Sequence, residues 1–135
     1  MPNQNIHAVI NLLMQVREIT SSHLPIGHSF IPYEMMLIVV RHYISQEELT
    51  VKRLFNSGEF SEMGNRYHFR KLIEKDFIVL KNHPLDSRLK LILPSQKLLD
   101  CFDQVSTQLF DAFLMISKQY LGFELTHAKD LPVSS

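Results

Sequence analysis

Basic side chains gather between Thr50 and Leu93, and within this segment Asp86 and Arg88 stand two positions apart. The segment holds nine lysines and arginines but only five acidic residues, so it carries four net positive charges in a chain whose net charge is zero. Such a concentration is typical of a surface that binds a polyanion, although solvated charges also cluster by chance. The candidate chemistry is therefore nucleic-acid binding, with an ordinary solvated surface as the alternative.

Many of these residues fall on one expected helix, at about 62–75, which buries Phe69, Leu72 and Ile73. Arginine can contact guanine in a bidentate manner, and tyrosine can reach a phosphate or a base. Glycine at 64 would let the start of the helix approach a duplex closely. A solvated helix face is the alternative. The predicted binding residues, beginning with the N-cap, are Ser61, Glu62, Met63, Gly64, Arg66, Tyr67, Arg70 and Lys71.

A β-hairpin is expected directly after this helix, from "FIVLKN" (77–82) and "RLKLIL" (88–93). We expect Leu89 and Leu91 to point inward and Lys90 outward. A hairpin that follows a basic helix forms a wing, and the negative potential of the DNA minor groove attracts an inserted arginine. Asp86 would hold Arg88 in place, unless the two form only a surface ion pair worth roughly 0 to 1 kcal/mol. The predicted wing contacts are Lys81, Asp86, Ser87, Arg88 and Lys90.

Four further helices are expected around these two elements, at about 4–22, 33–44, 51–57 and 95–122. Thr50 is the predicted N-cap of the third, with Leu49 and Leu54 as a hydrophobic staple. The order of elements predicts a mainly α fold with a small β-hairpin: a winged helix-turn-helix over 33–94, flanked by helices for dimerisation. The chain would form one domain over residues 1–135, with no regular pattern in the last dozen residues.

The apolar stripe of the last helix is too wide for a small winged domain to bury alone. We expect its second half to pack with the first helix of each subunit in a homodimer. The dimer would present two recognition helices about 34 Å apart and bind a pseudo-palindromic duplex site. The predicted dimer residues are Ile6, Ile10, Leu13, Leu109, Phe113, Ile116 and Tyr120.

From Leu49 onward the sequence resembles the MarR family of winged-helix transcriptional regulators. The similar stretches are "LTVKRLF", "SEMGNRYHFRKLIEKDFIVL" and "DSRLKLILP", the last containing the Asp86-x-Arg88 wing signature. The resemblance implies a dimeric regulator of transcription that binds double-stranded DNA, with a small-molecule effector possible in a crevice between the dimer helices and the winged core. Asp76 stands where the family usually has glycine. The chain ends soon after the long helix, so the family's last dimerisation helix is expected to be shortened or missing.

Other classes of function find little support in the sequence. The seven histidines form no metal-binding spacing, and the single cysteine, Cys101, lies at the edge of an apolar stripe, so neither a metal nor a cofactor is expected. No phosphate loop, nucleophile elbow or plausible triad is visible, so no enzyme is expected. We expect a cytoplasmic protein with no signal peptide and no membrane span. The alternative is a winged-helix module for protein–protein assembly that does not itself bind DNA.

Overall fold

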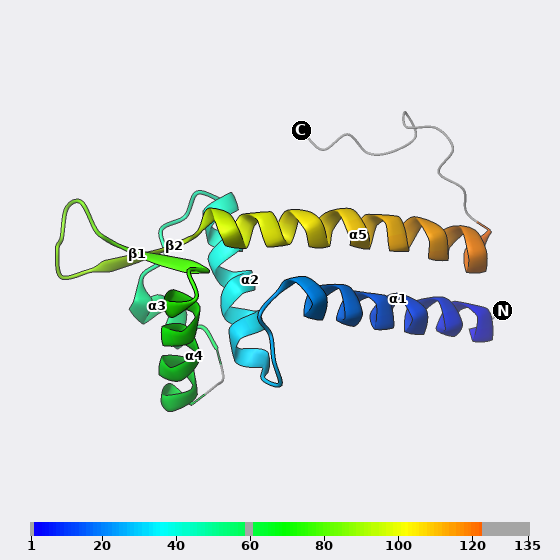
Figure 1. Cartoon of the computed structure of the whole chain (residues 1–135), viewed down its shortest axis with the longest axis horizontal. Coiled ribbons are helices and arrows are strands. Elements are labelled where there is room, and N and C mark those ends of the chain that lie inside the picture. The colour runs from blue at the N-terminus through cyan, green and yellow to red at the C-terminus, as the bar shows by residue number, and fades with distance from the viewer. Residues whose placement is uncertain (1, 59–60, 123–135) are drawn as a thin grey trace. The chain divides into compact units, whose positions relative to one another are not determined.

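The computed structural model describes residues 2–58 and 61–122 and divides the chain into two compact units. The winged unit comprises residues 23–103, and the helical unit comprises residues 1–22 with 104 onward. The expected fold class is confirmed: helices predominate, and the single hairpin follows the fourth of them (Figure 1). The elements in order are α1 (Pro2–His23), α2 (Phe30–Ile44), α3 (Val51–Asn56), α4 (Glu62–Glu74), β1 (Ile78–Asn82), β2 (Lys90–Pro94) and α5 (Gln96–Leu121).

Helix α2 is the centre of the winged unit and packs against α3, α4 and β2. It begins at Phe30, three residues before the expected start, because the side chain of Ser29 accepts a hydrogen bond from the backbone N–H of Ile31 and caps it there. Its buried side chains include Met36 and Val39, which belong to the core of this unit. Among the described residues, the largest fully buried side chains are Met36, Val39, Leu49, Ile78 and Leu98.

The two predicted N-caps on either side of the turn are confirmed. The Thr50 side chain accepts a hydrogen bond from the backbone N–H of Arg53 at 3.2 Å, and that of Ser61 accepts one from Gly64 at 3.1 Å. Leu49 and Leu54, the expected staple, are both buried. Hydrogen bonds between residues close in sequence therefore define where α3 and α4 begin, and no tertiary contact is needed for this.

Helix α4 ends in a Schellman motif whose left-handed residue is Asp76, with φ of 62°. The N–H of Asp76 donates to the carbonyl of Ile73, and the N–H of Phe77 donates to that of Leu72, which is the motif's paired arrangement. Leu72 and Phe77 are both buried, as the motif's usual apolar contact requires. The chain therefore makes the turn into the wing without the glycine that the sequence resemblance led us to expect.

Replacing Asp76 by alanine is expected to lower the free energy of unfolding by about 1 kcal/mol, because an alanine side chain offers no local hydrogen bond in the left-handed conformation. Asp76→Gly removes the steric cost and is the matched comparison, expected to be at least as stable as the alanine variant. Urea denaturation at neutral pH measures both. Equal stability of the alanine variant and the wild type would contradict strain at this turn.

The hairpin pairs β1 with β2 antiparallel, with Ile78 opposite Pro94 and Leu80 opposite Ile92. The expected inward direction of Leu89 and Leu91 was wrong: Ile92 and Pro94 are buried, Leu91 is half-buried and Leu89 is exposed. Because residues 91–94 are all apolar, alternation could not decide which of them faces the core. Tertiary pairing decides it, since the N–H of Ile92 donates to the carbonyl of Leu49 at 2.8 Å along the outer edge of β2.

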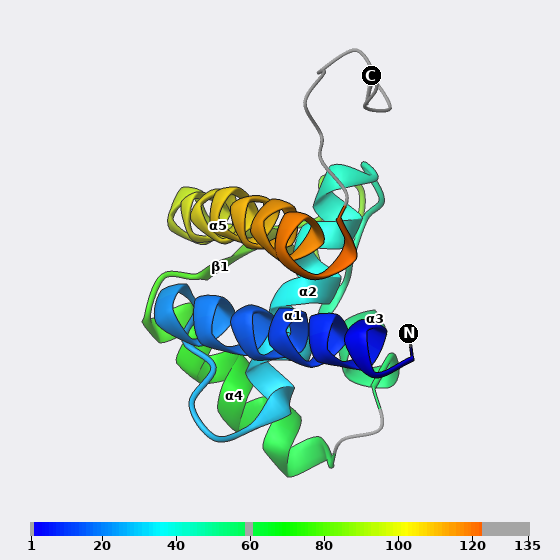
Figure 2. The same cartoon turned by 90° about the vertical axis from the view of Figure 1, so that its right-hand side faces the viewer.

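The N-cap of α5 is Ser95, whose hydroxyl accepts a hydrogen bond from the N–H of Leu98. In the helical unit, α1 and the second half of α5 run side by side in opposite directions (Figures 1 and 2). Tyr120 joins them: its hydroxyl accepts a hydrogen bond from Asn11, and its ring lies edge-on to His7. α5 ends before Gly122, which has a left-handed φ of 64°. The unpatterned last dozen residues, where a shortened helix was expected, lie outside the described residues.

In the described part of the chain, no helix is both long enough and apolar enough to span a bilayer.

Candidate nucleic-acid interface

Helix α4 presents a continuous exposed face in the winged unit. The residues on it are Glu62, Met63, Arg66, Tyr67, Arg70 and Lys71, all exposed and all predicted as contacts. Met63 is 82% exposed although it is apolar, so its side chain is not part of the core of this unit. The structure thus brings together on one helix face all the contact residues predicted for this helix, apart from Ser61 and Gly64.

The opposite face of α4 holds the helix in place. Phe69 and Leu72 are buried, and Phe69 meets the ring of Phe55 edge-on at 5.3 Å between centroids. Asn65 is buried as well, and its side-chain amide donates to the carbonyl of Phe55 at 3.4 Å, which satisfies one of its donors. This polar residue on the buried face of α4 therefore ties α4 to α3.

Ser61 and Gly64 have structural tasks at the start of α4. The hydroxyl of Ser61 is occupied as the N-cap. A Cβ built on Gly64 would stand 2.8 Å from the Cδ1 atom of Ile31, so a larger residue here would require the end of that side chain to shift. Close approach to a duplex, the role expected for Gly64, stays a prediction beside this contact with Ile31.

Within the exposed face, Arg66 is paired with Glu62 at 2.6 Å, one helical turn away. Both side chains are largely exposed, so the pair adds at most a few tenths of a kcal/mol to the helix. Lys71 lies 5.6 Å from the centre of the Tyr67 ring. Glu62 therefore gives the Arg66 side chain a defined direction, and breaking this ion pair costs little free energy.

The wing tip is organised around Asp86 and Arg88. The Asp86 carboxylate accepts three hydrogen bonds from Arg88: from Nε at 3.1 Å, from Nη2 at 3.3 Å and from the backbone N–H at 3.1 Å. The Arg88 side chain is nevertheless 88% exposed, so the guanidinium stands in solvent with one edge braced. These hydrogen bonds hold the pKa of Asp86 below its ordinary value, and the side-chain hydrogen bonds from Arg88 have the largest effect.

Because the pKa of Asp86 is lowered in the folded state, the brace is fully present at neutral pH and is lost only as the pH falls below about 3.9, the ordinary aspartate value. In Arg88→Ala the side-chain hydrogen bonds disappear, and we expect the pKa of Asp86 to rise toward that ordinary value. Titration followed by the carboxyl-carbon NMR signal measures this directly. An unshifted midpoint in the variant would contradict the assigned cause.

The base of the wing is held by His83, for which the sequence predicted no binding role. Its Nδ1 accepts the backbone N–H of Leu85 at 3.0 Å, so Nε2 carries the proton and donates to Glu48 at 3.1 Å. The remaining predicted wing residues Lys81, Ser87 and Lys90 are exposed, and Lys90 donates to the side chain of Asn82. Only the long-range contact to Glu48, 35 residues away in sequence, reveals this role of His83.

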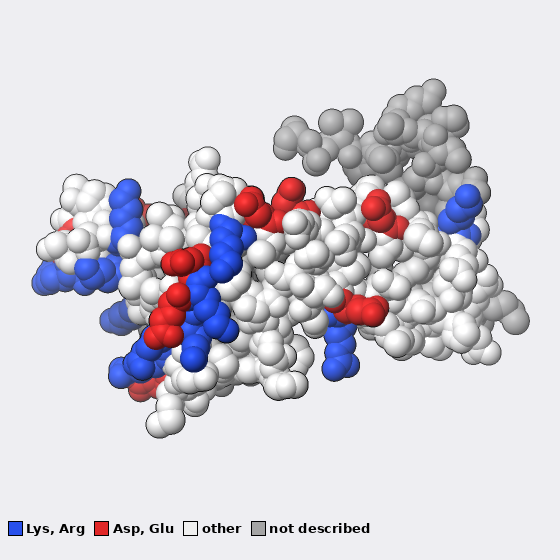
Figure 3. Space-filling model, in the orientation of Figure 1, with Lys and Arg blue, Asp and Glu red and all other residues white. Residues whose placement is uncertain are grey.

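The space-filling view places charge where these two elements lie. Lysine and arginine side chains run along α4 and onto the wing, with acidic side chains between them on α4 (Figure 3). The surface is therefore mixed in sign rather than uniformly basic, in accord with the neutral net charge of the chain.

In the helical unit the predicted dimer residues fall into two groups. Ile116 is buried and Tyr120 is half-buried, in contact with α1 of the same chain; Leu109 is half-buried too. A second group is exposed: Ile6, Ile10, Leu13 and Phe113. Four further apolar side chains of this unit are exposed but were not among the predicted dimer residues: Val9, Met14, Phe110 and Met115.

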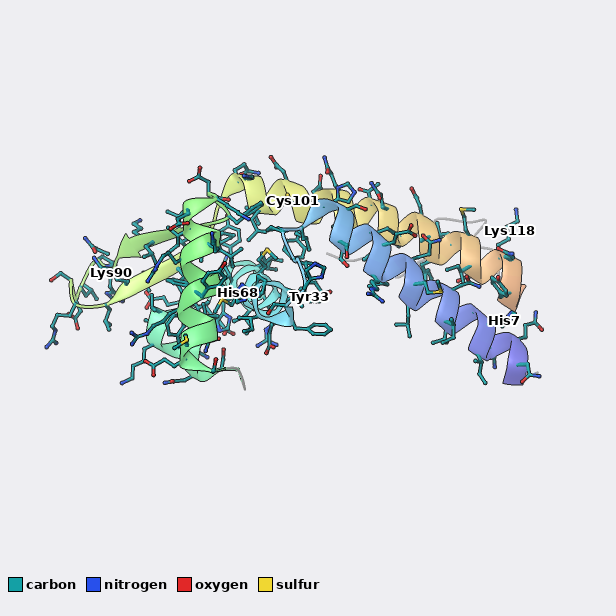
Figure 4. The ribbon with its side chains drawn as sticks, turned by 60° about the horizontal axis from the view of Figure 1, so that its bottom comes forward. His7, Tyr33, His68, Lys90, Cys101 and Lys118 are labelled. Atoms are coloured by element: carbon teal, nitrogen blue, oxygen red, sulfur yellow. The ribbon has the colours of Figure 1, made fainter. Side chains whose placement is uncertain are left out.

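Among the described residues, no group of three or more His, Cys, Asp or Glu side chains lies close enough together to hold a metal ion. Cys101 is a free, half-buried thiol near the start of α5 (Figure 4).

Several solved structures share this fold. E. coli MarR in its apo form matches with a TM-score of 0.56 at 11% identity, over 96% of this chain and 87% of that one. AbsC, a MarR family transcriptional regulator from Streptomyces coelicolor, matches with 0.54 at 12% identity, over 95% and 80%. The transcriptional regulator PA4135 matches with 0.56 at 17% identity, over 89% and 83%. No protein-family model and no curated protein sequence matches the chain significantly. The chain therefore has a MarR-like winged-helix fold, and two of these neighbours are described as transcriptional regulators.

Proposed function

We propose that this protein binds double-stranded DNA, with α4 in the major groove and the wing in the adjacent minor groove. The observation that carries the proposal is the placement, in one compact unit, of the exposed face of α4 and of an exposed arginine braced at the wing tip. The major groove admits an α-helix, and the narrow minor groove attracts arginine. The fold shared with transcriptional regulators supports the same reading.

The exposed face of α4 offers groups for reading bases. Arg66 and Arg70 can each donate two hydrogen bonds to guanine, and Met63 can contact the methyl group of thymine. Glu62 accepts hydrogen bonds only, as cytosine N4 requires, and it releases Arg66 at little cost. Lys71 and the wing lysines suit phosphate contacts, which position the protein without reading sequence.

Replacing Arg88 by alanine is expected to weaken duplex binding about tenfold, because hydrogen bonds to charged groups each contribute about 1.5–3 kcal/mol. The melting temperature should stay unchanged, since the side chain is exposed. Fluorescence anisotropy with a labelled duplex measures the affinity. Lys118→Ala, which removes one positive charge from the helical unit, is the control and should bind as the wild type does. Equal affinity of the Arg88 variant and this control would remove the wing from the interface.

A homodimer is the second part of the proposal, and α1 supports it. One face of α1 is buried within the chain through Ala8 and Ile19. The exposed face carries a second apolar stripe at helical spacing, formed by Ile6, Val9, Ile10, Leu13 and Met14. An apolar stripe of this length on a soluble helix marks a protein-binding surface. Pairing with a second copy would double the DNA contacts and favour two half-sites one helical turn apart.

Occupying such a site would regulate transcription by blocking or recruiting polymerase. A small-molecule effector stays a prediction that rests on the sequence resemblance alone, and we assign it no residues.

Protein–protein assembly without DNA contact is the second candidate, and the wing favours it in one respect. Leu85 at its tip is 90% exposed, and Val79 and Leu89 nearby are exposed as well. A salt series separates the two functions, because each phosphate contact makes the log of DNA affinity fall by about 0.9 per log unit of salt. If no duplex binds at low salt, the assembly function is the one to pursue.

A further inference from the structure

A cavity of about 320 Å³ opens in the winged unit between α4 and the loop that joins α1 to α2. It lies beside the predicted DNA-contact face, since Tyr67 and Lys71 belong to both. His68 projects from α4 toward α2 on this side of the helix (Figure 4). The lining residues are Pro25, Ile26, Gly27, His28, Ser29, Pro32, Tyr67, His68, Lys71, Leu72 and Lys75.

The polar groups of this cavity suit an anion. Lys71 and Lys75 supply two ammonium groups, and Ser29, Tyr67 and the two histidines supply further hydrogen-bond donors. None of the described residues that line it is acidic. Three other cavities in the described part of the chain each include a carboxylate: Asp111 in one, Glu34 in the second, and Glu47 with Glu48 in the third.

The rest of the lining is apolar: Pro25, Ile26, Pro32 and Leu72 contribute no charge and no side-chain hydrogen-bond donor. A bare phosphate would leave this surface unused, whereas a phosphate with its attached deoxyribose would place the carbon-rich face of the sugar against it. The volume also exceeds what a single phosphate needs. The lining therefore matches a piece of nucleic-acid backbone better than a free inorganic anion.

The position of the cavity on α4 supports the same occupant. At 100° per residue, Lys71 and Lys75 lie on the flank of the helix between its exposed centre, at Met63 and Tyr67, and its buried side, at Leu72. A helix seated in the major groove has a phosphate backbone along each flank. The flank with the cavity would thus face one strand while the exposed centre faces the bases.

We propose that this cavity binds one sugar–phosphate unit of the DNA strand that passes beside α4, with His28, Ser29, His68, Lys71 and Lys75 as the phosphate-binding groups. The inference deepens the proposed DNA-binding function and rests on it. It adds the loop between α1 and α2 to the interface, a segment to which the sequence assigned no role.

The test uses the full chain with His28→Ala and Lys75→Gln combined, because both side chains are exposed and neither belongs to the core. We expect the variant to bind a selected duplex about tenfold more weakly near 0.1 M salt. We also expect a salt slope smaller by about 0.9, the value for one lost phosphate contact. Lys118→Gln is the charge-matched control and should keep the wild-type slope.

A duplex with one neutral methylphosphonate at a time locates the contact. Neutralising the contacted phosphate should weaken the wild type but leave the double variant unaffected, since its contact is already lost. If the wild type binds duplex and the double variant matches it in affinity and slope, the cavity proposal is overturned while DNA binding stands.

A third arm distinguishes a soluble ligand from DNA. The histidine ring signals of His28 and His68 are followed by NMR while deoxycytidine monophosphate is added. Saturation at micromolar concentration, together with wild-type duplex binding by the double variant, would overturn the DNA source in favour of a small phosphate ester. If the wild type binds no duplex at all, the proposed function fails first, and this proposal fails with it.

Discussion

Replacing Leu13 by glutamate is expected to raise the dissociation constant of the homodimer by about a hundredfold or more, because it places two carboxylates from the two copies in an apolar contact. Leu13 is exposed in the single chain, at the middle of the α1 stripe, so the fold of each subunit should persist. Sedimentation velocity across a concentration series measures the dimer constant, and circular dichroism checks the helix content.

Leu13→Met is the matched control, since methionine keeps the apolar surface and the helix preference of leucine. It should remain dimeric. The glutamate variant should also lose affinity for a two-half-site duplex while binding a single half-site as weakly as the wild type does. If the wild type is monomeric at every concentration, the dimer proposal is contradicted. If the glutamate variant dimerises normally, the interface does not include Leu13.

Leu98→Ala is expected to lower the free energy of unfolding by about 2–5 kcal/mol, because it removes buried methyl groups and leaves a cavity. Leu98 is fully buried at the start of α5, among the core residues of the winged unit. That loss is a large part of the total stability of an ordinary domain, so partial unfolding near physiological temperature should follow. Chemical denaturation gives the value.

Leu85→Ala makes the same chemical change at the wing tip, where the side chain is 90% exposed. Its effect on stability should stay within about 0.5 kcal/mol. Equal destabilisation by the two variants would mean that the burial of Leu98 is misassigned. The contrast also separates the stability of the winged unit from the function of its wing.

Those parts of the fold that local chemistry decides could be predicted from the sequence. Thr50 and Ser61 are hydroxyl residues directly before helical patterns, and both cap as expected. The expected pairing of Asp86 with Arg88 involves residues only two positions apart, and the wing tip shows it. Helix order and the hairpin then follow from apolar spacing alone.

What could not be predicted depends on residues far apart in the chain. The inward face of β2 is decided by the hydrogen bond from Ile92 to Leu49, and no pattern within four successive apolar residues contains that information. Gly64 lies against Ile31, 33 positions earlier, and His83 is paired with Glu48. The cavity beside α4 likewise needs the loop at 25–29 to meet residues 67–75, so only the folded chain reveals it.

The central claim, that this winged unit reads duplex DNA, is tested most directly by selecting bound sequences from a pool of random duplexes. The account predicts enrichment of one pseudo-palindromic site, with half-sites one helical turn apart and guanines where Arg66 and Arg70 reach the major groove. Repeating the selection with Arg66→Ala should relax the preference at one position of each half-site. A pool that shows no enrichment at low salt, with a folded protein, would contradict the claim.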